Sequence, residues 1–231
     1  MKTIGLIGGM SWESTKVYYE LINQKVNASL GGFHSAKILM YSVDFAEVEK
    51  LQHEGNWPEL CRLMVEAARR LEKAGAGIIL LCTNTMHLCS KEISRNISLP
   101  FLHIADATGK KISEEKIKKV GLLGTGFTME KDFYKTALNE KFKIEVIIPF
   151  RTERARIHQI IYNELVHGTI LEESREKTKN IIANLQNRGA EGVILGCTEI
   201  PLLISEKNIS LPLFDTTKIH AEQAVEWALN S

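Results

Sequence analysis

Cysteine is scarce in this sequence, long apolar runs are absent, and each shortage excludes a class of protein. Four cysteines in 231 residues, none in a CxxC spacing, argue against a disulfide scaffold and against a structural zinc site. No run approaches the ~18 apolar residues that a membrane span needs, and the first residues lack the pattern of a signal peptide. We therefore expect a protein of the reducing cytoplasm that has no membrane partner.

A dominant charge is also missing. Lysine and arginine number 29 against 28 aspartates and glutamates, so the net charge is only +1. That balance gives no case for a nucleic-acid partner. The seven histidines show no metal-ligand spacing, so we expect no metal. The hydrophobic share of 44% and the charged share of 25% are ordinary for a globular protein.

Short apolar runs alternate along the chain with amphipathic segments of helical length, which is typical of an α/β fold with a parallel sheet. The expected strands are residues 3–7, 37–42, 77–82, 101–104, 120–123, 144–147, 192–196 and 213–214. The expected helices include residues 12–27, 57–73, 130–139, 153–167, 172–188 and 216–228.

An internal repeat organises these elements. Three pairs of segments match: IGLIGG (4–9) with VGLLGTG (120–126), GAGIILLCTNT (75–85) with GAEGVILGCTE (189–199), and LPFLHIAD (99–106) with LPLFDTT (211–217). Their common order and nearly constant offset predict a duplicated unit of ~110 residues. We predict two similar doubly wound parallel-sheet domains related by a pseudo-two-fold duplication, formed by residues 1–105 with 216–231 and by residues 106–215.

Ligands of open α/β sheets bind outside the carboxyl ends of the strands, so we expect the site in the cleft between the two domains. The turn Gly8-Gly9-Met10-Ser11 opens a helix there and offers backbone N–H groups that suit a carboxylate or a phosphate. A tight turn without a ligand is the alternative. A nucleotide is disfavoured, because neither GxGxxG nor GxxxxGK[ST] is present.

Two further triplets follow strands at matching places in the repeat: Thr83-Asn84-Thr85 and Cys197-Thr198-Glu199. Eight residues separate Gly75 from Thr83, and eight separate Gly189 from Cys197. Thr83 is therefore the counterpart of Cys197. Neighbouring residues of an extended segment point in opposite directions, so Cys82 is expected to be a buried structural cysteine.

Cys197 is the candidate reactive thiol. At a strand-to-helix turn, backbone amides can lower a thiol pKa from ~8.5 to between ~3.5 and ~7.5; a packed strand-end cysteine is the alternative. Cys61 and Cys89 lie within helical patterns and are expected to be core or surface residues.

Three polar side chains beside these turns have simple structural explanations. Thr125 and Thr128 supply hydroxyls at the second glycine turn, or they cap the helix that follows. His87 lies close to the Thr83 turn, and we favour a hydrogen-bonded structural role for it over a place in the site.

The segments GLIGGMSWEST (5–15), CTNTMH (82–87), LPFLHIAD (99–106), GLLGT (121–125) and GCTE (196–199) resemble the aspartate/glutamate racemase family over essentially the whole chain. The likeness is to bacterial broad-specificity amino-acid and aspartate/glutamate racemases. The resemblance implies two similar α/β domains with the site between them and a homodimer. It also implies racemisation of a small amino-acid substrate with no cofactor, neither pyridoxal phosphate nor metal.

In that family one cysteine removes the α-proton and a second, on the other face, returns a proton. Cys197 matches the second cysteine, and Thr83 stands where the family has the first. A threonine hydroxyl is a far weaker acid than a thiol, so Thr83 can donate a proton but is a poor resting base. By matching positions, the resemblance implies substrate contacts at Met10, Ser11, Gln52, Asn84, Thr85, Thr125, Thr128, Thr198 and Glu199.

We therefore expect a racemase for aspartate or glutamate in which Cys197 and Thr83 serve opposite faces of the α-carbon. Two alternatives stay open. One is a one-cysteine decarboxylase or cis–trans isomerase of the same superfamily, whose chemistry needs only one thiol. The other is a non-catalytic amino-acid-binding protein.

Overall fold

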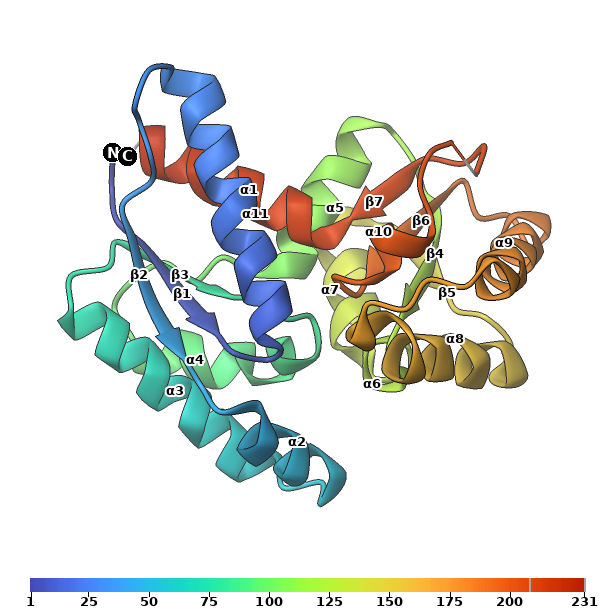
Figure 1. Cartoon of the computed structure of the whole chain (residues 1–231), viewed down its shortest axis with the longest axis horizontal. Helices are drawn as coiled ribbons and strands as arrows, with labels where there is room; N and C mark the ends of the chain where they lie inside the picture. The colour runs from blue at the N-terminus through green and yellow to red at the C-terminus, as the bar shows by residue number, and fades with distance from the viewer. Residues whose placement is uncertain (208, 231) are drawn as a thin grey trace. The chain divides into compact units, whose positions relative to one another are not determined.

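The structure, a computed structural model, describes residues 1–207 and 209–230, and the chain divides into two compact units. The first comprises Met1–Ile104 and His220–Ser231, and the second comprises Ala105–Ile219. The boundaries expected from the sequence fall after residues 105 and 215. Ser231, the last residue of the expected first domain, lies outside the described residues. The last helix, drawn red in Figure 1, begins in the second unit and ends in the first.

The first unit is built on a parallel sheet whose strands lie in the order β2-β1-β3. The strands are β1 (Ile4–Gly8), β2 (Ile38–Ser42) and β3 (Ile78–Leu81). Its helices are α1 (Trp12–Leu30), α2 (Phe45–His53), α3 (Trp57–Lys73), the 3-10 helix η1 (Thr85–Cys89), α4 (Ser90–Asn96) and most of α11 (Thr216–Asn230).

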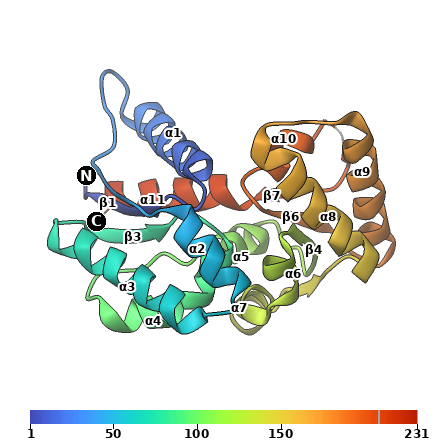
Figure 2. The same cartoon turned by 60° about the horizontal axis from the view of Figure 1, so that its bottom comes forward.

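Both faces of this sheet are covered, as a parallel sheet requires. Alternate strand residues point to opposite faces. Ile7 and Leu81 join a cluster with α3 and α4, whereas Leu6 and Cys82 join a second cluster with α1 and α11. Figure 2 shows α11 running past the strands of this unit on the side of α1. The prediction that Cys82 is a buried structural cysteine is confirmed.

The second unit repeats this arrangement with one more strand, in the order β5-β4-β6-β7, all parallel. Its strands are β4 (Lys119–Gly124), β5 (Glu145–Ile147), β6 (Gly192–Gly196) and β7 (Leu213–Asp215). Its helices are α5 (Ile104–Glu114), α6 (Gly126–Glu130), α7 (Asp132–Phe142), α8 (Arg151–Asn163), the 3-10 helix η2 (Leu165–His167), α9 (Glu172–Asn187) and α10 (Ile200–Leu203).

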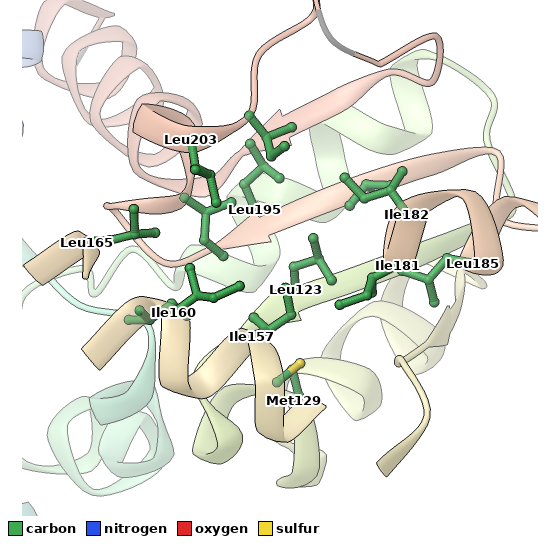
Figure 3. Packing of buried hydrophobic residues seen from close by; sticks show 14 of the residues in the cluster. Leu123, Met129, Ile157, Ile160, Leu165, Ile181, Ile182, Leu185, Leu195 and Leu203 are labelled. Carbon is green, nitrogen blue, oxygen red and sulfur yellow. The ribbon is translucent and has the colours of Figure 1, made fainter. Parts of the chain in front are cut away.

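One face of the second sheet carries the core drawn in Figure 3. Leu123 of β4 and Leu195 of β6 point into it from the sheet, and α8 and α9 supply the isoleucines that cover them. Leu123 and Leu195 are at most 2% exposed. Full burial of one such side chain contributes about 2 kcal/mol, so this cluster of 15 buried residues contributes strongly to the stability of the unit.

The duplication predicted from the repeat is confirmed by topology and by equivalent hydrogen bonds. In each unit the first strand is central, the second lies on one side and the third on the other. The amide of Ile79 donates to the Pro100 carbonyl at 2.9 Å, and the amide of Val193 donates to the Pro212 carbonyl at 2.9 Å. Both prolines come from the third matched pair of segments.

Three sequence-based assignments of secondary structure are wrong in part. Residues 101–104 form no strand, because Phe101 makes a single bridge to Ile79 and the chain enters α5 at Ile104. The helix expected over residues 130–139 is interrupted at Lys131, whose backbone is extended. The helix expected over residues 153–167 ends at Asn163, because Glu164 leaves helical geometry before η2 begins.

Cys61 and Cys89, which were expected to be core or surface residues of helices, form a disulfide. Their Cα atoms are 5.0 Å apart, a separation that a disulfide spans. The two residues lie 28 positions apart, one on α3 and one at the end of η1. No cysteine spacing predicts this pair, since the thiols meet only when η1 packs on α3. The free cysteines are Cys82 and Cys197.

None of the helices in the described residues is long and apolar enough to cross a membrane.

Candidate functional site

The first unit gathers six of the predicted site residues where its three strands end. Gly8 pairs with Ser42, and Ile7 pairs with Leu81, so the carboxyl ends of the strands lie together. We call this region the first edge. The residues that it brings together are Met10 and Ser11 after β1, Gln52 on α2 after β2, and Thr83, Asn84 and Thr85 after β3. The Gln52 amide donates to the sulfur of Met86 at 3.2 Å, which ties α2 to η1.

The glycine turn after β1 is stabilised by a threonine that sequence analysis missed. Thr15 is 4% exposed. Its hydroxyl accepts from the Gly9 amide at 2.8 Å and donates to the Ser11 carbonyl at 3.0 Å. Gly9 has φ +93°, and a Cβ there would lie 2.2 Å from the carbonyl oxygen of Val43. The turn thus requires glycine, and the Gly9 amide is bonded to Thr15 and is not offered to a ligand.

The turn after β3 carries Thr83. The amide of Cys82 donates to the Ile7 carbonyl at 2.9 Å, continuing the hydrogen-bond ladder of the sheet one residue past the strand. Thr83 is the next residue and is half-buried, whereas Asn84 and Thr85 are buried. Burial strongly raises the pKa of the Cys82 thiol. Cys82 is therefore a protonated core residue, and Thr83 presents the accessible side chain of this turn.

The second unit gathers the other predicted site residues where β4 and β6 end, because Gly124 pairs with Gly196. We call this region the second edge; it carries Thr125, Thr128, Cys197, Thr198 and Glu199. Thr125 caps α6 by accepting from the Thr128 amide at 3.3 Å. Thr128 is fully buried, and its Cγ2 atom would lie 3.2 Å from a Cβ at Gly196. Helix capping and close packing account for both threonines.

Cys197 is half-buried and its thiol is engaged. The thiol donates to Oε2 of Glu199 at 2.9 Å. Burial and the Glu199 carboxylate raise the pKa of Cys197 well above its usual value, and the backbone N–H groups of Thr198 and Glu199 lower it by less. The expectation of a lowered pKa is therefore wrong for this ligand-free structure. The sequence argument counted the amides of the turn but not the carboxylate two residues on.

Thr83 and Cys197 occupy equivalent positions at the two edges. Cys82 makes the last ladder hydrogen bond on β3, and Gly196 makes the last pair on β6. Thr83 and Cys197 each come directly after, and both are half-buried.

In the part of the chain that the structure describes, no group of three or more metal-ligating side chains could hold a metal ion.

Comparison with known proteins decides the family. The family model of the Asp/Glu/hydantoin racemases matches residues 7–224 of the chain. The chain belongs to the Asp/Glu/hydantoin racemase family. Members of the family are racemases, so the chain is an isomerase.

Solved structures and curated sequences agree with this placement of the racemase. It is 52% identical to a Yersinia pestis protein assigned to the Asp/Glu racemases, with all of both chains covered and a TM-score of 0.95. It is 35% identical to an aspartate racemase homologue from Pyrococcus horikoshii OT3, again over all of both chains, with a TM-score of 0.87. It is 25% identical to the broad specificity amino-acid racemase RacX of Bacillus subtilis over 96% of each sequence.

One contact of the racemase at the second edge escaped sequence analysis. His158 of α8 accepts from the Gly126 amide at 3.2 Å through Nδ1, beside the cap of α6. His87 bonds the Thr83 carbonyl. This bond confirms the hydrogen-bonded structural role expected for His87, whereas the pairing of His158 with Gly126 crosses 32 positions and leaves no pattern.

Proposed function

We propose that the chain is a cofactor-independent amino-acid racemase for aspartate or glutamate. In this proposal Cys197 and Thr83 exchange protons with opposite faces of the substrate α-carbon. The observation that carries it is the equivalence of the two residues, each the first beyond the last ladder hydrogen bond of its sheet. A reaction between mirror images requires an acid/base group on each face, and a duplicated fold supplies one from each copy.

In the proposed first step, the Glu199 carboxylate accepts the proton of the Cys197 thiol. Cys197 carries its proton in the ligand-free state, so it must lose that proton before it can act as a base. Glu199 Oε2, 2.9 Å away, takes the proton, and the thiolate then removes the α-proton. The Thr83 hydroxyl returns a proton to the other face, and its oxygen regains one from solvent. Glu199 then releases its proton to solvent, which restores the starting state. Each step moves one proton, and no bond to the substrate other than C–H breaks.

In this proposal the polar groups of the two edges bind the charged groups of the substrate. Backbone amides and the hydroxyls of Ser11, Thr85 and Thr198 hold the α-carboxylate and stabilise the charge that develops on it. Gln52 and Asn84 offer amide donors for the side-chain carboxylate. Glu199, which accepts the proton of Cys197, is assigned no charged group of the substrate. Met10, Thr125 and Thr128, which are buried, shape these turns.

Equilibrium limits what the Cys/Thr asymmetry can achieve. Two enantiomers have the same free energy in water, so kcat/KM must be equal in both directions. Individual kcat and KM values can differ between the enantiomers. We propose that α-proton exchange at the Cys197 face is faster than net inversion, since Thr83 is the weaker acid.

A one-cysteine enzyme is the second candidate, a decarboxylase or a cis–trans isomerase. Thr83 in place of a second thiol favours it, because these reactions need a single thiol.

We also propose a homodimer and a cytoplasmic location. Because disulfides are rare in reducing compartments, the cytoplasmic location predicts that Cys61 and Cys89 are reduced thiols in the cell.

The test is proton NMR of L- and D-aspartate and L- and D-glutamate in D₂O with the protein and no added cofactor, followed by chiral chromatography. Loss of the α-proton together with appearance of the opposite enantiomer is expected. Decarboxylation or double-bond isomerisation of other acids, without exchange in any of the four, would favour the one-cysteine enzyme. Tight binding of one of these amino acids with no turnover would favour the remaining alternative, a non-catalytic amino-acid-binding protein.

A further inference from the structure

His87 is tied to the turn that carries Thr83. The imidazole is fully buried. Its Nε2 accepts from the Ile104 amide at 3.2 Å, and its Nδ1 lies 2.8 Å from the Thr83 carbonyl oxygen. An amide can only donate, so Nε2 carries no proton and Nδ1 carries one. Nδ1–H therefore donates to the Thr83 carbonyl, and the ring has a single tautomer in which both nitrogens are bonded.

The surroundings keep this imidazole neutral. The rings of His103 and His220 lie 4.7 Å and 5.6 Å from it, centroid to centroid, and Phe101 lies at 5.6 Å. Burial and the two neighbouring histidines lower the pKa of His87 well below its usual value. His220 is bonded in turn to the Tyr18 hydroxyl and to the Leu102 carbonyl, and burial lowers its pKa to about 3.

We propose that His87 is a positioning residue that fixes Thr83 for proton transfer to the substrate, an inference that rests on the proposed function. The Cys82 amide is held to Ile7 in the sheet at 2.9 Å, and the Thr83 carbonyl is held by His87. The backbone is thus restrained immediately before and after the Thr83 side chain. Proton transfer depends on this placement, because small displacements of a reacting group lower rates on the order of a hundredfold.

Two substitutions separate the bonds of His87. In His87→Asn the amide nitrogen replaces Nδ1, so the bond to Thr83 is kept and the bond to Ile104 is lost. In His87→Gln the amide oxygen replaces Nε2, so the bond to Ile104 is kept and the bond to Thr83 is lost. Each variant loses one buried hydrogen bond of the same imidazole, which makes the two a matched pair.

The readout is the ratio of inversion to α-proton exchange with retention, measured in D₂O on the enantiomer that exchanges faster. Exchange with retention uses only the Cys197 face, whereas inversion also needs Thr83. His87→Gln is expected to lower the ratio on the order of tenfold, and His87→Asn by much less. A purely structural role would lower both rates together and leave the ratio unchanged in both variants, which would overturn the proposal.

Tyr134→Phe is the control for loss of a buried hydrogen bond elsewhere, since the Tyr134 hydroxyl bonds Thr108 at 3.0 Å in the second unit. It is expected to leave the ratio unchanged; an equal fall there would also overturn the role of His87. Wild-type protein that neither exchanges nor inverts any of the four amino acids would overturn the proposed function itself. Normal wild-type inversion with an unchanged ratio in His87→Gln would overturn only the inference on His87.

A measurement on the wild-type protein covers the case in which the variants do not fold. NMR of ¹⁵N-labelled histidine is expected to show one buried ring in the Nδ1–H form that stays neutral from about pH 5 to pH 8. Assignment of His87 to the Nε2–H tautomer would contradict the bond to Thr83 and overturn the proposal.

Discussion

The first and second edges share a backbone plan and differ in how their key side chain is held. At the first edge the side chain of Thr83 is accessible and its backbone is fixed by His87. At the second edge the Cys197 thiol itself donates a hydrogen bond to the Glu199 carboxylate. The two copies therefore keep Thr83 and Cys197 at the same place in the fold but hold them by different interactions. At the first edge we expect activity to depend on how the backbone places Thr83. At the second edge we expect it to depend on whether Cys197 or Glu199 carries the proton.

Removing the thiol should separate the two edges most strongly. Cys197→Ala is expected to abolish both exchange and inversion, with a loss of ~10²- to 10⁴-fold, because it removes the only thiol at either edge. The assay is the D₂O exchange experiment. Cys82→Ala is the matched control, since Cys82 is the other free cysteine and lies in the core. A large loss in Cys82→Ala with retained activity in Cys197→Ala would invert the assignment.

Opening the disulfide should weaken the first unit and not the second. The Cys61–Cys89 bond closes a loop of 28 positions, and loop-closure entropy assigns such a bond about 3 kcal/mol of stability. Reduction, or Cys61→Ser with Cys89→Ala, is expected to lower the free energy of unfolding by about that amount in urea titrations with and without dithiothreitol. An unchanged midpoint on reduction would show that the bond is absent from the protein in solution.

Neutralising Glu199 tests whether the second edge is governed by the proton. The carboxylate disfavours the thiolate, so Glu199→Gln is expected to lower the pKa of Cys197 and to speed alkylation by iodoacetamide at neutral pH, about tenfold per unit of pKa. Racemisation is expected to fall, because the acceptor of the thiol proton is gone. Slower alkylation, or faster racemisation, would contradict this role. Glu164→Gln, in the same unit but outside the second edge, is the control for loss of a carboxylate.

Making the edges chemically alike should give the smallest effect. Thr83→Cys places a stronger acid at the first edge, and net inversion is expected to rise several-fold relative to exchange with retention. The same D₂O experiment measures it. An unchanged ratio would place the second proton donor elsewhere.

Much of this architecture could be predicted from the sequence, because it depends on local pattern and on the repeat. The helix over residues 57–73 and the strand over residues 192–196 have the predicted bounds. The equivalence of Thr83 and Cys197 follows from counting eight residues from two matched glycines, Gly75 and Gly189, which both take positive φ. A glycine that ends a helix fixes the register of the strand after it, so the count remains valid in three dimensions.

The contacts that define the site chemistry could not be predicted in this way. The disulfide joins residues on two elements that are not neighbours in the sequence, and the Cys197–Glu199 bond depends on side-chain conformation. The tautomer of His87 is set by Ile104, 17 positions away. The segment 101–104 was misassigned because an apolar run favours a strand, whereas here only Phe101 is paired before α5 begins.

The return of the last helix to the first unit has a consequence for synthesis on the ribosome. One face of the first sheet is closed by Ala224 and Val225 of α11 against Ile4 and Leu6, and the Lys2 amide donates to the Ala228 carbonyl at 2.9 Å. These contacts join β1 to a helix that is translated after the strands of the second unit. The second unit is continuous and can complete its core first. The unit that contains β1 is thus begun before the second unit and completed after it, and one apolar face of its sheet stays uncovered until α11 has been translated.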